Sequence, residues 1–484
     1  MAHYRDAERY YRVPLTAPWA RLALGGALAA LLLFLAPKVW RHSQAERLVQ
    51  KATLESIQRA IALEPDRAEY RDMLGRVYLF SLTSYDPKLA ADSLQRAVQL
   101  NPAVAEYWLD LATAYDSLGR KKDSVECVET ARRHDPLNPK IAWSTGNIRA
   151  EAGDIPGALD AWRDAIEGDS TKTGVGLDLG WKLAGDTKVL LDHLVPRTNE
   201  ADLAFLDYLC ERHIGKPELV WDRMIARGQP FPPKRATNYF YWLLLTSPES
   251  ERRSNVETAK KVWRQLLHMI ASSSAVDGEG APILEGESGH ALRVSGGGNL
   301  INNPGFESTM LNMGFDWTWS SPKGALLVLD ESVVKDGRRS ARIDFDGTQS
   351  MIFAGLGQMV PVEPGHRYRL TSNLRGERIQ GGAGIRLEVV DARVDEIAVP
   401  IAHGQEVFQT DGWVSDSFDF TAPPKIYLIA VRVQRNLRGA ITSKLSGVFW
   451  LDNVVLRDLD SPASTSAPTK GRAPSGSSAP QGEP

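Results

Sequence analysis

Hydrophobic and polar residues follow three different patterns along this chain of 484 residues. The first pattern is a run without any charge at residues 22–37. Over residues 41–271 apolar residues recur every three or four positions, the period of a helix with one buried face. Over residues 299–458 they alternate with polar residues, the period of a β-strand. We therefore predict a multidomain chain with a single transmembrane helix, an all-α region and an all-β sandwich.

Trp19 and Trp40 flank the uncharged run, and basic residues lie at its edges. The 22 residues from Trp19 to Trp40 suffice to cross a hydrocarbon core of ~30 Å at ~1.5 Å per residue. Tryptophan favours the membrane interface, and long basic side chains extend outward to water. We predict a cytoplasmic tail at residues 1–18 and an uncleaved transmembrane helix at residues 19–40.

Two other interpretations of the uncharged run fit the sequence less well. A cleaved signal peptide requires small residues just before the cut, whereas this run ends with the bulky Phe34 and with Pro37. A buried helix of a soluble protein would need a partner helix of similar hydrophobicity, and the sequence offers none. Charge does not set the orientation, because four basic residues precede the run and four follow it: Arg5, Arg9, Arg12, Arg21, Lys38, Arg41, Arg47 and Lys51.

Three similar phrases, RAIALEP, RAVQLNP and TARRHDP, end at Pro65, Pro102 and Pro136, which are 37 and 34 residues apart. An alanine stands five residues before each proline. This pattern resembles the tetratricopeptide repeat, in which small residues let two helices approach and a proline ends the second helix. The resemblance implies a helical solenoid over residues 41–271, with clear repeats at about 54–169 and degenerate repeats after them.

The resemblance also implies that the first helix of each pair faces a groove that binds a peptide of a partner protein. Motif alignment places Glu69, Asp72, Arg76, Leu109 and Thr113 along this groove, together with the residues that we assign to peptide binding: Glu106, Asp116, Lys140, Trp143 and Asn147. Repeats of this family that grip C-terminal carboxylates use clustered lysine and asparagine, and only Lys140 and Asn147 qualify here. A solvated groove wall is the alternative to peptide binding.

The helical period ends at a glycine- and serine-rich segment, residues 272–298, which we predict to be a linker. Beyond it, the phrases NLINNPGFE, GQMVPVEPGHRYRLTSNLRGE, GWVSDSFDFTAP and FWLDNVVLRD occur in this order. Together they resemble the jelly-roll carbohydrate-binding modules of bacterial glycan enzymes. The resemblance implies a β-sandwich over residues 299–458, although a shared fold does not fix function. The tail, residues 459–484, has no aromatic residue and is predicted to be disordered.

Candidate glycan contacts come from aromatic and polar strand faces. Phe315, Trp317 and Trp319 share one face of an extended strand, where rings either stack on sugars or fill the core. We expect at least one of these rings to be buried and Trp319 to be exposed. Arg375 lies on a polar strand face, and Arg386 and Glu388 lie on another. Each polar face is either a binding surface or ordinary solvated surface.

Two acids point to a metal. Glu307 follows the first turn of the sandwich, and Asp452 lies on its last predicted strand. In the carbohydrate-binding modules that the sequence resembles, acids at these places help to hold a structural calcium ion. Carboxylate oxygens suit Ca²⁺, with carbonyl groups and water completing six to eight ligands. We therefore expect a possible structural Ca²⁺ and no other cofactor.

Composition narrows the remaining functions. A net charge of −3 offers no basic surface for nucleic acid. The two cysteines form no disulfide framework, and the nine histidines show no zinc-binding spacing. The sequence contains no nucleophile elbow or phosphate loop, and the predicted helices and sandwich leave no room for a catalytic domain. The chain is predicted not to be an enzyme.

These observations favour a bacterial envelope scaffold that binds a protein partner through its helical repeats and a polysaccharide through its sandwich. Its role would be in polysaccharide assembly, export or retention. The short polar N-terminal tail and the glycan-type sandwich favour a single-pass inner-membrane protein whose bulk is periplasmic. One alternative is an assembly or secretion scaffold whose sandwich contacts only protein. A weaker alternative is a glycan-processing enzyme with a site that its sequence does not reveal.

Overall fold

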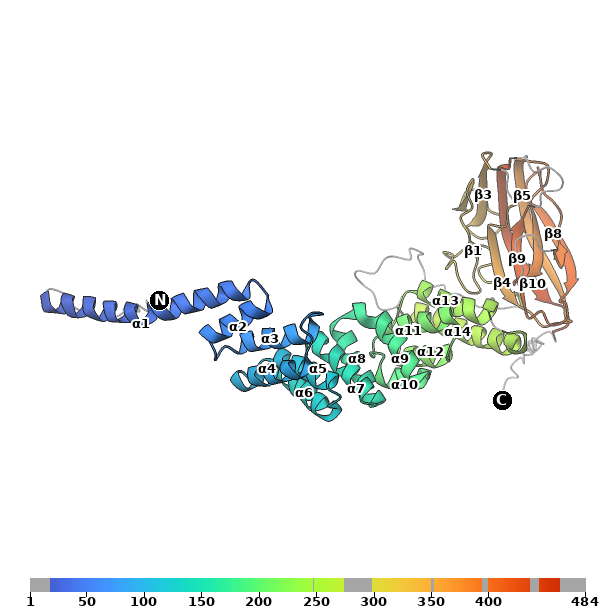
Figure 1. Ribbon diagram of the computed structural model, residues 1–484. Coiled ribbons are helices and arrows are strands. Elements are labelled where there is room, and N and C mark those ends of the chain that lie inside the picture. Colours follow the sequence, from blue (N-terminus) through green and yellow to red (C-terminus); the bar gives the residue numbers. More distant parts are fainter. Residues whose placement is uncertain are drawn as a thin grey trace, which may run out of the picture. The chain divides into compact units, whose positions relative to one another are not determined.

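The computed structural model shows a helical part followed by a β-sandwich, as the sequence predicts (Figure 1). The chain forms two compact units, Met1–Phe205 and Leu206–Pro484. Most of the predicted N-terminal tail, linker and C-terminal tail lies outside the described residues. The structure describes residues 18–246, 248–273, 298–349, 352–393, 399–435 and 444–461.

The first helix, α1 (Pro18–Val49), contains the predicted membrane segment. Among the described residues it is the one helix long and apolar enough to cross a membrane, and its apolar window is wholly exposed. The other end of α1 is packed, because Ala45 and Val49 are buried against the following helices. The Tyr70 hydroxyl also donates a hydrogen bond of 2.9 Å to Glu46. One continuous helix therefore joins the apolar segment to the helical stack.

Helix pairs follow α1 in the first unit (Figure 1). After α2 (Leu54–Leu63), the pairs are α3 (Ala68–Phe80) with α4 (Pro87–Leu100), α5 (Ala105–Ser117) with α6 (Lys121–His134), and α7 (Pro139–Glu151) with α8 (Ile155–Gly168). The predicted prolines, Pro65, Pro102 and Pro136, each lie two residues beyond the end of α2, α4 or α6. This agreement confirms the helical repeats.

Small residues bring the two helices of a pair together. A Cβ added to Gly75 would lie 2.4 Å from Cγ of Leu94, and one added to Gly146 would lie 2.3 Å from Cδ1 of Trp162. A side chain at either position would force the helices apart. Ala131, another small residue, is fully buried on α6. Trp108 is only partly buried, and its indole Nε1–H donates a hydrogen bond to the Pro102 carbonyl.

Further helices continue to the end of the helical part. They are α9 (Thr173–Ala184), α10 (Thr187–His193), α11 (Asn199–Arg212), α12 (Pro217–Arg227), α13 (Thr237–Tyr241) and α14 (Arg252–Ser273), with short turns η1 (Ser170–Lys172), η2 (Pro233–Ala236), η3 (Trp242–Thr246) and η4 (Glu249–Glu251). By sequence, α12–α14 belong to the helical region of residues 41–271. In the structure they share the second compact unit with the sandwich.

Two antiparallel five-stranded sheets form the sandwich, in the orders β1-β4-β9-β6-β7 and β2-β3-β10-β5-β8. The strands are β1 (Thr318–Trp319), β2 (Ala325–Asp330), β3 (Ser340–Asp346), β4 (Leu356–Pro361), β5 (Arg367–Gln380), β6 (Arg386–Asp391), β7 (Ala402–His403), β8 (Val414–Thr421), β9 (Leu428–Gln434) and β10 (Ser446–Asp458). Alternate residues of both sheets fill the core, among them Ile343, Phe449, Leu387 and Val431. The predicted all-β sandwich is confirmed.

The aromatic stretch before β1 joins helices to sandwich within the second unit. Phe315 is buried, with its ring 6.1 Å from that of Phe240 and 6.0 Å from that of Trp263. Arg393 adds a hydrogen bond of 2.9 Å from Nε to the carbonyl of Leu244. Side chains of α13 and α14 therefore pack directly on the first residues of the sandwich.

Candidate functional site

Two aspartates face each other on the row of first helices. Asp72 lies on α3 and Asp110 lies on α5, and these two helices are in contact. Asp72 is only 6% exposed, and its Oδ1 atom has no hydrogen-bond partner among the described residues. Buried carboxylate oxygens normally accept hydrogen bonds, because losing hydration without replacement is costly. Asp72 and Asp110 form a hydrogen bond with each other when one of them is protonated, and Asp72 Oδ1 has no other partner among the described residues.

Electrostatics at this pair favour a bound proton. Burial raises the pKa of Asp72, the negative charge of Asp110 raises it further, and the pKa reaches about 7. Burial likewise raises the pKa of Asp110, although the nearby charge of Arg76 opposes the shift. Two carboxylates in one site cannot easily both ionise. Near neutral pH Asp72 is therefore partly protonated.

The neighbouring cations neutralise this pair poorly. Arg76 Nε lies 3.8 Å from Asp110 Oδ2, and the Arg76 side chain is 52% exposed. Lys140 on α7 is exposed and acts on Asp110 through its charge alone. Glu69 and Glu106, both exposed, add further negative charge on the same row of helices. The site is thus a recessed acidic surface.

An apolar hollow adjoins the acidic surface. Its volume is about 540 Å³, and it is lined by Ala52, Ile57, Met73, Arg76, Val77, Phe80 and Ser81. Phe80 is 63% exposed, which is unusual for a phenylalanine in a helix of a packed domain. Arg76 borders the hollow and also reaches toward Asp110. The two features therefore meet at one side chain.

The five residues assigned by sequence to the peptide groove fall into two groups. Glu106 and Lys140 are exposed on the row of first helices. The other three contact residues of the helical stack, although Asn147 is itself exposed. Asp116 pairs with Lys121 at 2.5 Å, Asn147 accepts a hydrogen bond of 3.1 Å from Trp162 Nε1, and the Trp143 ring lies 5.8 Å from the Trp162 ring.

On the sandwich, Arg375 belongs to a row of residues across neighbouring strands, in register with Trp450 and Arg342. The guanidinium carbon of Arg375 lies 5.3 Å from the centre of the Trp450 ring, and that of Arg342 lies 5.6 Å from it. Both arginines also pair with acids, Arg375 with Glu377 at 2.5 Å and Arg342 with Asp344 at 2.8 Å. Arg375 is therefore held by intramolecular contacts and is only partly accessible.

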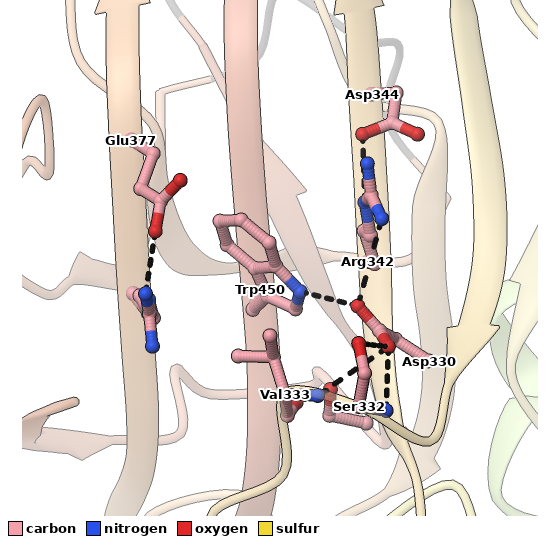
Figure 2. A network of polar contacts seen from close by, with 9 residues as sticks. Asp330, Ser332, Val333, Arg342, Asp344, Glu377 and Trp450 are labelled. Carbon is pink, nitrogen blue, oxygen red and sulfur yellow. Dashed lines mark hydrogen bonds and ion pairs between the residues drawn. The ribbon is translucent and has the colours of Figure 1, made fainter. Parts of the chain in front are cut away.

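Trp450 is fixed from its other end by Asp330 (Figure 2). The indole Nε1 donates a hydrogen bond of 2.9 Å to Asp330 Oδ2, and Ser332 donates its hydroxyl to Oδ1 at 2.6 Å. Burial alone would raise the pKa of Asp330, but these hydrogen bonds prevail and lower it to about 2. The network stabilises the face of this sheet and leaves the indole almost fully buried.

Three other predicted glycan contacts require correction, because the structure buries them. Trp317 is fully buried in the core, with its ring 5.0 Å from that of Phe306. Glu388 is also fully buried and accepts hydrogen bonds from Arg386 at 3.2 Å and from Arg432 at 2.9 Å. A buried charge of this kind is compensated by its partners and not by water. None of the three offers a surface to a sugar in this conformation.

Trp319 is the predicted glycan contact that keeps an accessible ring. It is partly buried, and its ring centre lies 5.9 Å from that of Phe353. The chain thus has one buried and one partly exposed tryptophan in this stretch. The sequence expectation of a mixed pair agrees with these positions.

The two predicted metal ligands lie beside one loop. Asp452 is fully buried, and its Oδ2 accepts the N–H groups of Lys335 at 2.9 Å and Asp336 at 3.2 Å. Glu307 Oε1 accepts the N–H of Arg338 at 2.8 Å. Burial raises the pKa of Asp452, and the charge of Glu307 contributes to the same shift. Two hard oxygen donors therefore approach each other, although the described residues contain no cluster of three or more metal-type side chains.

Comparisons with known proteins agree with the helical geometry. Residues 109–172 match the family profile described as tetratricopeptide repeat. The matched residues cover most of α5 to α8, and the helix pairs α3–α8 are called the tetratricopeptide-repeat array below after this similarity. A crystal structure of MamA is 26% identical over 25% of this chain and 69% of its own, with a TM-score of 0.23. No curated protein matches the chain.

Two solved carbohydrate-binding modules resemble the sandwich. One, described as "CBM4 structure and function", is 16% identical over 33% of this chain and 99% of its own, with a TM-score of 0.25. The other is TmCBM61 in complex with β-1,4-galactotriose, 21% identical over 33% of this chain and 98% of its own, with a TM-score of 0.24.

Within the tetratricopeptide-repeat array, sequence alignment identified Asp72 as a groove residue and missed Asp110. It assigned the neighbouring Leu109 to the groove, but Leu109 is buried at 4% exposure. A shift of one residue turns a helical position by about 100°, which is enough to exchange core and surface. An acid at position 110, next to a leucine assigned to an exposed face, was the available signal.

Proposed function

We propose that this chain is a membrane-anchored, non-enzymatic scaffold of the bacterial cell envelope. The tetratricopeptide-repeat array binds a protein partner, and the sandwich contacts glycan during polysaccharide assembly, export or retention. The observation that carries the proposal is the recessed acidic surface and adjoining apolar hollow on the first helices. An incomplete buried carboxylate beside an open hollow is what a binding surface presents before its partner arrives.

The anchoring part of the proposal rests on α1. Its apolar window is exposed along its whole length, and a water-exposed helix of this composition would be strongly unfavourable. Insertion as a single-pass helix of the inner membrane removes that cost. Reporter fusions after Arg47 and after Asp458 test the orientation, and periplasmic-type activity is expected at both sites. Cytoplasmic-type activity at both sites would contradict the periplasmic placement.

Protein binding by the array is testable in intact membranes. A photo-crosslinking residue at position 106, exposed on α5, should give a discrete adduct with one partner protein. The same residue at position 133, exposed on the second helix α6, is the matched control and should give none. Equal labelling from both positions, or labelling from neither, would reject a partner on the row of first helices.

Glycan binding rests on the sandwich and on Trp319 as its partly exposed ring. A tryptophan face can stack on the apolar face of a sugar, and several weak contacts along a polymer add up. The full chain should therefore be tested on arrays of long polysaccharides. We expect Trp319→Ala to abolish binding, while Phe408→Ala, which removes another exposed ring, leaves it intact. A folded chain that retains no polysaccharide would reject the glycan role.

A structural Ca²⁺ remains part of the proposal. Glu307 and Asp452 would hold the ion, and backbone carbonyl groups and water would complete its shell. When bound, the ion would supply charge compensation for two acids that now face each other. The melting temperature of the chain should then rise with added Ca²⁺ and fall with a chelator. The Glu307→Gln variant should lose this response, and an unchanged response would reject the site.

A protein-only scaffold is the second candidate. The specific observation in its favour is the burial of Trp317, Arg386 and Glu388, which removes three predicted sugar contacts. The glycan arrays separate the two candidates. Retention of a polysaccharide that depends on Trp319 favours the first, and crosslinking from the array without any glycan retention favours the second.

A further inference from the structure

We infer that the Asp72–Asp110 pair receives a lysine or arginine side chain of the partner protein. The inference rests on the proposed protein-binding function of the array and names the chemistry of its guest. The occupant is a segment of the partner that carries a cationic residue and, nearby, an apolar one.

The first step is the incomplete hydrogen bonding of Asp72. Its residue surface is 6% exposed, and Oδ1 has no donor among the described residues. An ammonium or guanidinium group supplies N–H donors and a positive charge together, which gives the strongest class of hydrogen bond to a carboxylate. A neutral donor would satisfy the oxygen but would leave the charge of the pair uncompensated.

The second step is the sign of the surrounding field. The charged groups that act on the pair are Arg76 from α3, Glu106 from α5 and Lys140 from α7. Tyr107 on α5, which feels the charge of Asp72, also feels Glu69 and Arg67 beside α3. Together with the pair itself, they comprise four acids and three cations, and Tyr107 is neutral because its pKa is raised by burial. The surface is therefore negative whenever both aspartates are ionised. A cationic guest is attracted to it, and an anionic guest is repelled.

The third step is that the resident cations leave the position open. Arg76 approaches only Asp110, at 3.8 Å, and it stays half exposed. Lys140 forms no ion pair among the described residues and is exposed. Neither of them satisfies Asp72 Oδ1. A side chain from outside reaches the pair at Asp110, whose side chain is 15% exposed, with Asp72 buried behind it.

The hollow adds a second requirement on the guest. Arg76 lines the hollow and lies four residues after Asp72 on the same face of α3, a rise of about 6 Å along the helix. An extended peptide covers a similar length, about 6.6 Å, in two residues. We therefore expect an apolar residue two positions from the cation in the partner segment. Phe80, at the rim, widens the apolar surface that such a residue would cover.

Binding is linked to a proton. In the free chain the pKa of Asp72 is about 7, so the pair binds a proton as the pH falls through this value. When the cationic side chain enters, that proton leaves to solvent and both carboxylates pair with the guest. Affinity should consequently weaken as the pH falls from 8 to 6, because the proton competes with the guest for the pair.

The experiment uses the full chain in lipid nanodiscs and a displayed library of random twelve-residue peptides. Selected peptides should be enriched in lysine or arginine, with an apolar residue two positions away. Replacing that lysine with norleucine should weaken binding about tenfold, the loss expected for one charge-assisted hydrogen bond. Asp72→Asn and Asp110→Asn should cause similar losses, whereas Asp92→Asn, an exposed aspartate on α4, should cause none.

The outcomes separate the inference from the function on which it rests. Selected peptides without a cationic residue, or peptides whose affinity is unchanged by both Asp72→Asn and Asp110→Asn, would overturn the inference while peptide binding stands. A library that yields no binder at all would overturn the proposed peptide-binding function as well. Melting curves of the two variants show whether they fold, and two independent substitutions keep the test valid if one does not.

Discussion

Gly314 and Trp263 are in such close contact that a Cβ added to Gly314 would lie 2.6 Å from Cζ3 of the indole. Gly314 belongs to the stretch that precedes the first strand of the sandwich, and Trp263 belongs to α14. The backbone of one segment thus rests on the ring of the other. Helices α12–α14 and the sandwich are consequently expected to unfold together as one cooperative unit.

Gly314→Ala tests this contact. The added methyl group collides with the indole, so the free energy of unfolding should fall by ~1–3 kcal/mol beyond any backbone strain. Gly365→Ala is the matched control, because Gly365 also has a positive φ but has no atom within 4 Å of its added Cβ. Urea denaturation monitored by tryptophan fluorescence gives both values. Equal losses in the two variants would show that the contact with Trp263 contributes nothing.

The repeat register is tested by Ala131→Arg. Ala131 is fully buried on α6, so arginine would both overpack the site and bury an unpaired charge. We expect the free energy of unfolding to fall by several kcal/mol. Losses of up to ~4–5 kcal/mol are typical only of severe changes in a protein core. Ala62→Arg on the exposed side of α2 should change it by less than ~0.5 kcal/mol. A melting temperature like that of wild type for Ala131→Arg would mean that this helix face is not buried.

Trp317→Ala empties a large core site. The indole packs on Phe306 and donates a hydrogen bond of 3.0 Å to the Asn303 carbonyl, and both contacts are lost. The expected destabilisation is ~3–5 kcal/mol, the usual cost of removing a large buried aromatic side chain. Trp319→Ala should cost clearly less, because that ring is only partly buried. Urea denaturation of the two variants makes the comparison. A larger loss of stability for Trp319→Ala than for Trp317→Ala would show that Trp317 is not the core ring.

Asp72→Asn should change how stability depends on pH. The pKa of this carboxyl is raised to about 7 in the folded chain, so between its ordinary pKa and 7 the folded state binds more protons than the unfolded state. The free energy of unfolding of the wild type should therefore fall as the pH rises through this window. The total loss is up to ~1.4 kcal/mol for each unit by which folding raises the pKa. Asparagine carries no titrating group, so the variant should be more stable than wild type at pH 8.

The comparison for this prediction is made at two values of pH. Thermal melts at pH 4.5 and pH 8 should show the advantage of Asp72→Asn at pH 8 alone. The control Asp92→Asn alters an exposed aspartate and should track the wild type throughout. An advantage of Asp72→Asn that is equal at both pH values would point to packing and not to ionisation.

The parts of the structure that could be predicted from sequence are those with local causes. Pro65, Pro102 and Pro136 mark helix ends because proline removes a hydrogen-bond donor wherever it stands. The alternation of buried and more accessible residues along β5, where Tyr368 and Leu370 are buried, follows from the geometry of an extended chain. These signals do not depend on what covers the element, so they gave the helix pairs and the sandwich correctly.

The parts that escaped prediction depend on what covers each face. Arg386 and Glu388 lie in an ordinary polar strand pattern, yet both are buried. A sequence pattern does not distinguish a buried salt bridge from charged residues that are exposed to water. Asp110 became visible as a site residue only when α3 and α5 were placed side by side. The contact of α14 with Gly314 likewise joins segments that share no periodic pattern.

With α1 in a membrane as proposed, the uninterrupted course of this helix would restrict how the array searches for the proposed partner. Five residues, about 7.5 Å of helix, separate Trp40 from Ala45, the first buried residue of the packed end. A flexible tether would let the array roam over tens of ångströms, but a helix that is itself part of the stack allows little such reach. With α1 inserted in the bilayer, the acidic surface is held at a nearly fixed distance from the membrane and at a nearly fixed angle to it. A partner held in the same membrane then needs only to diffuse in two dimensions, whereas a free partner must also find the narrow approach that the lipid surface leaves open.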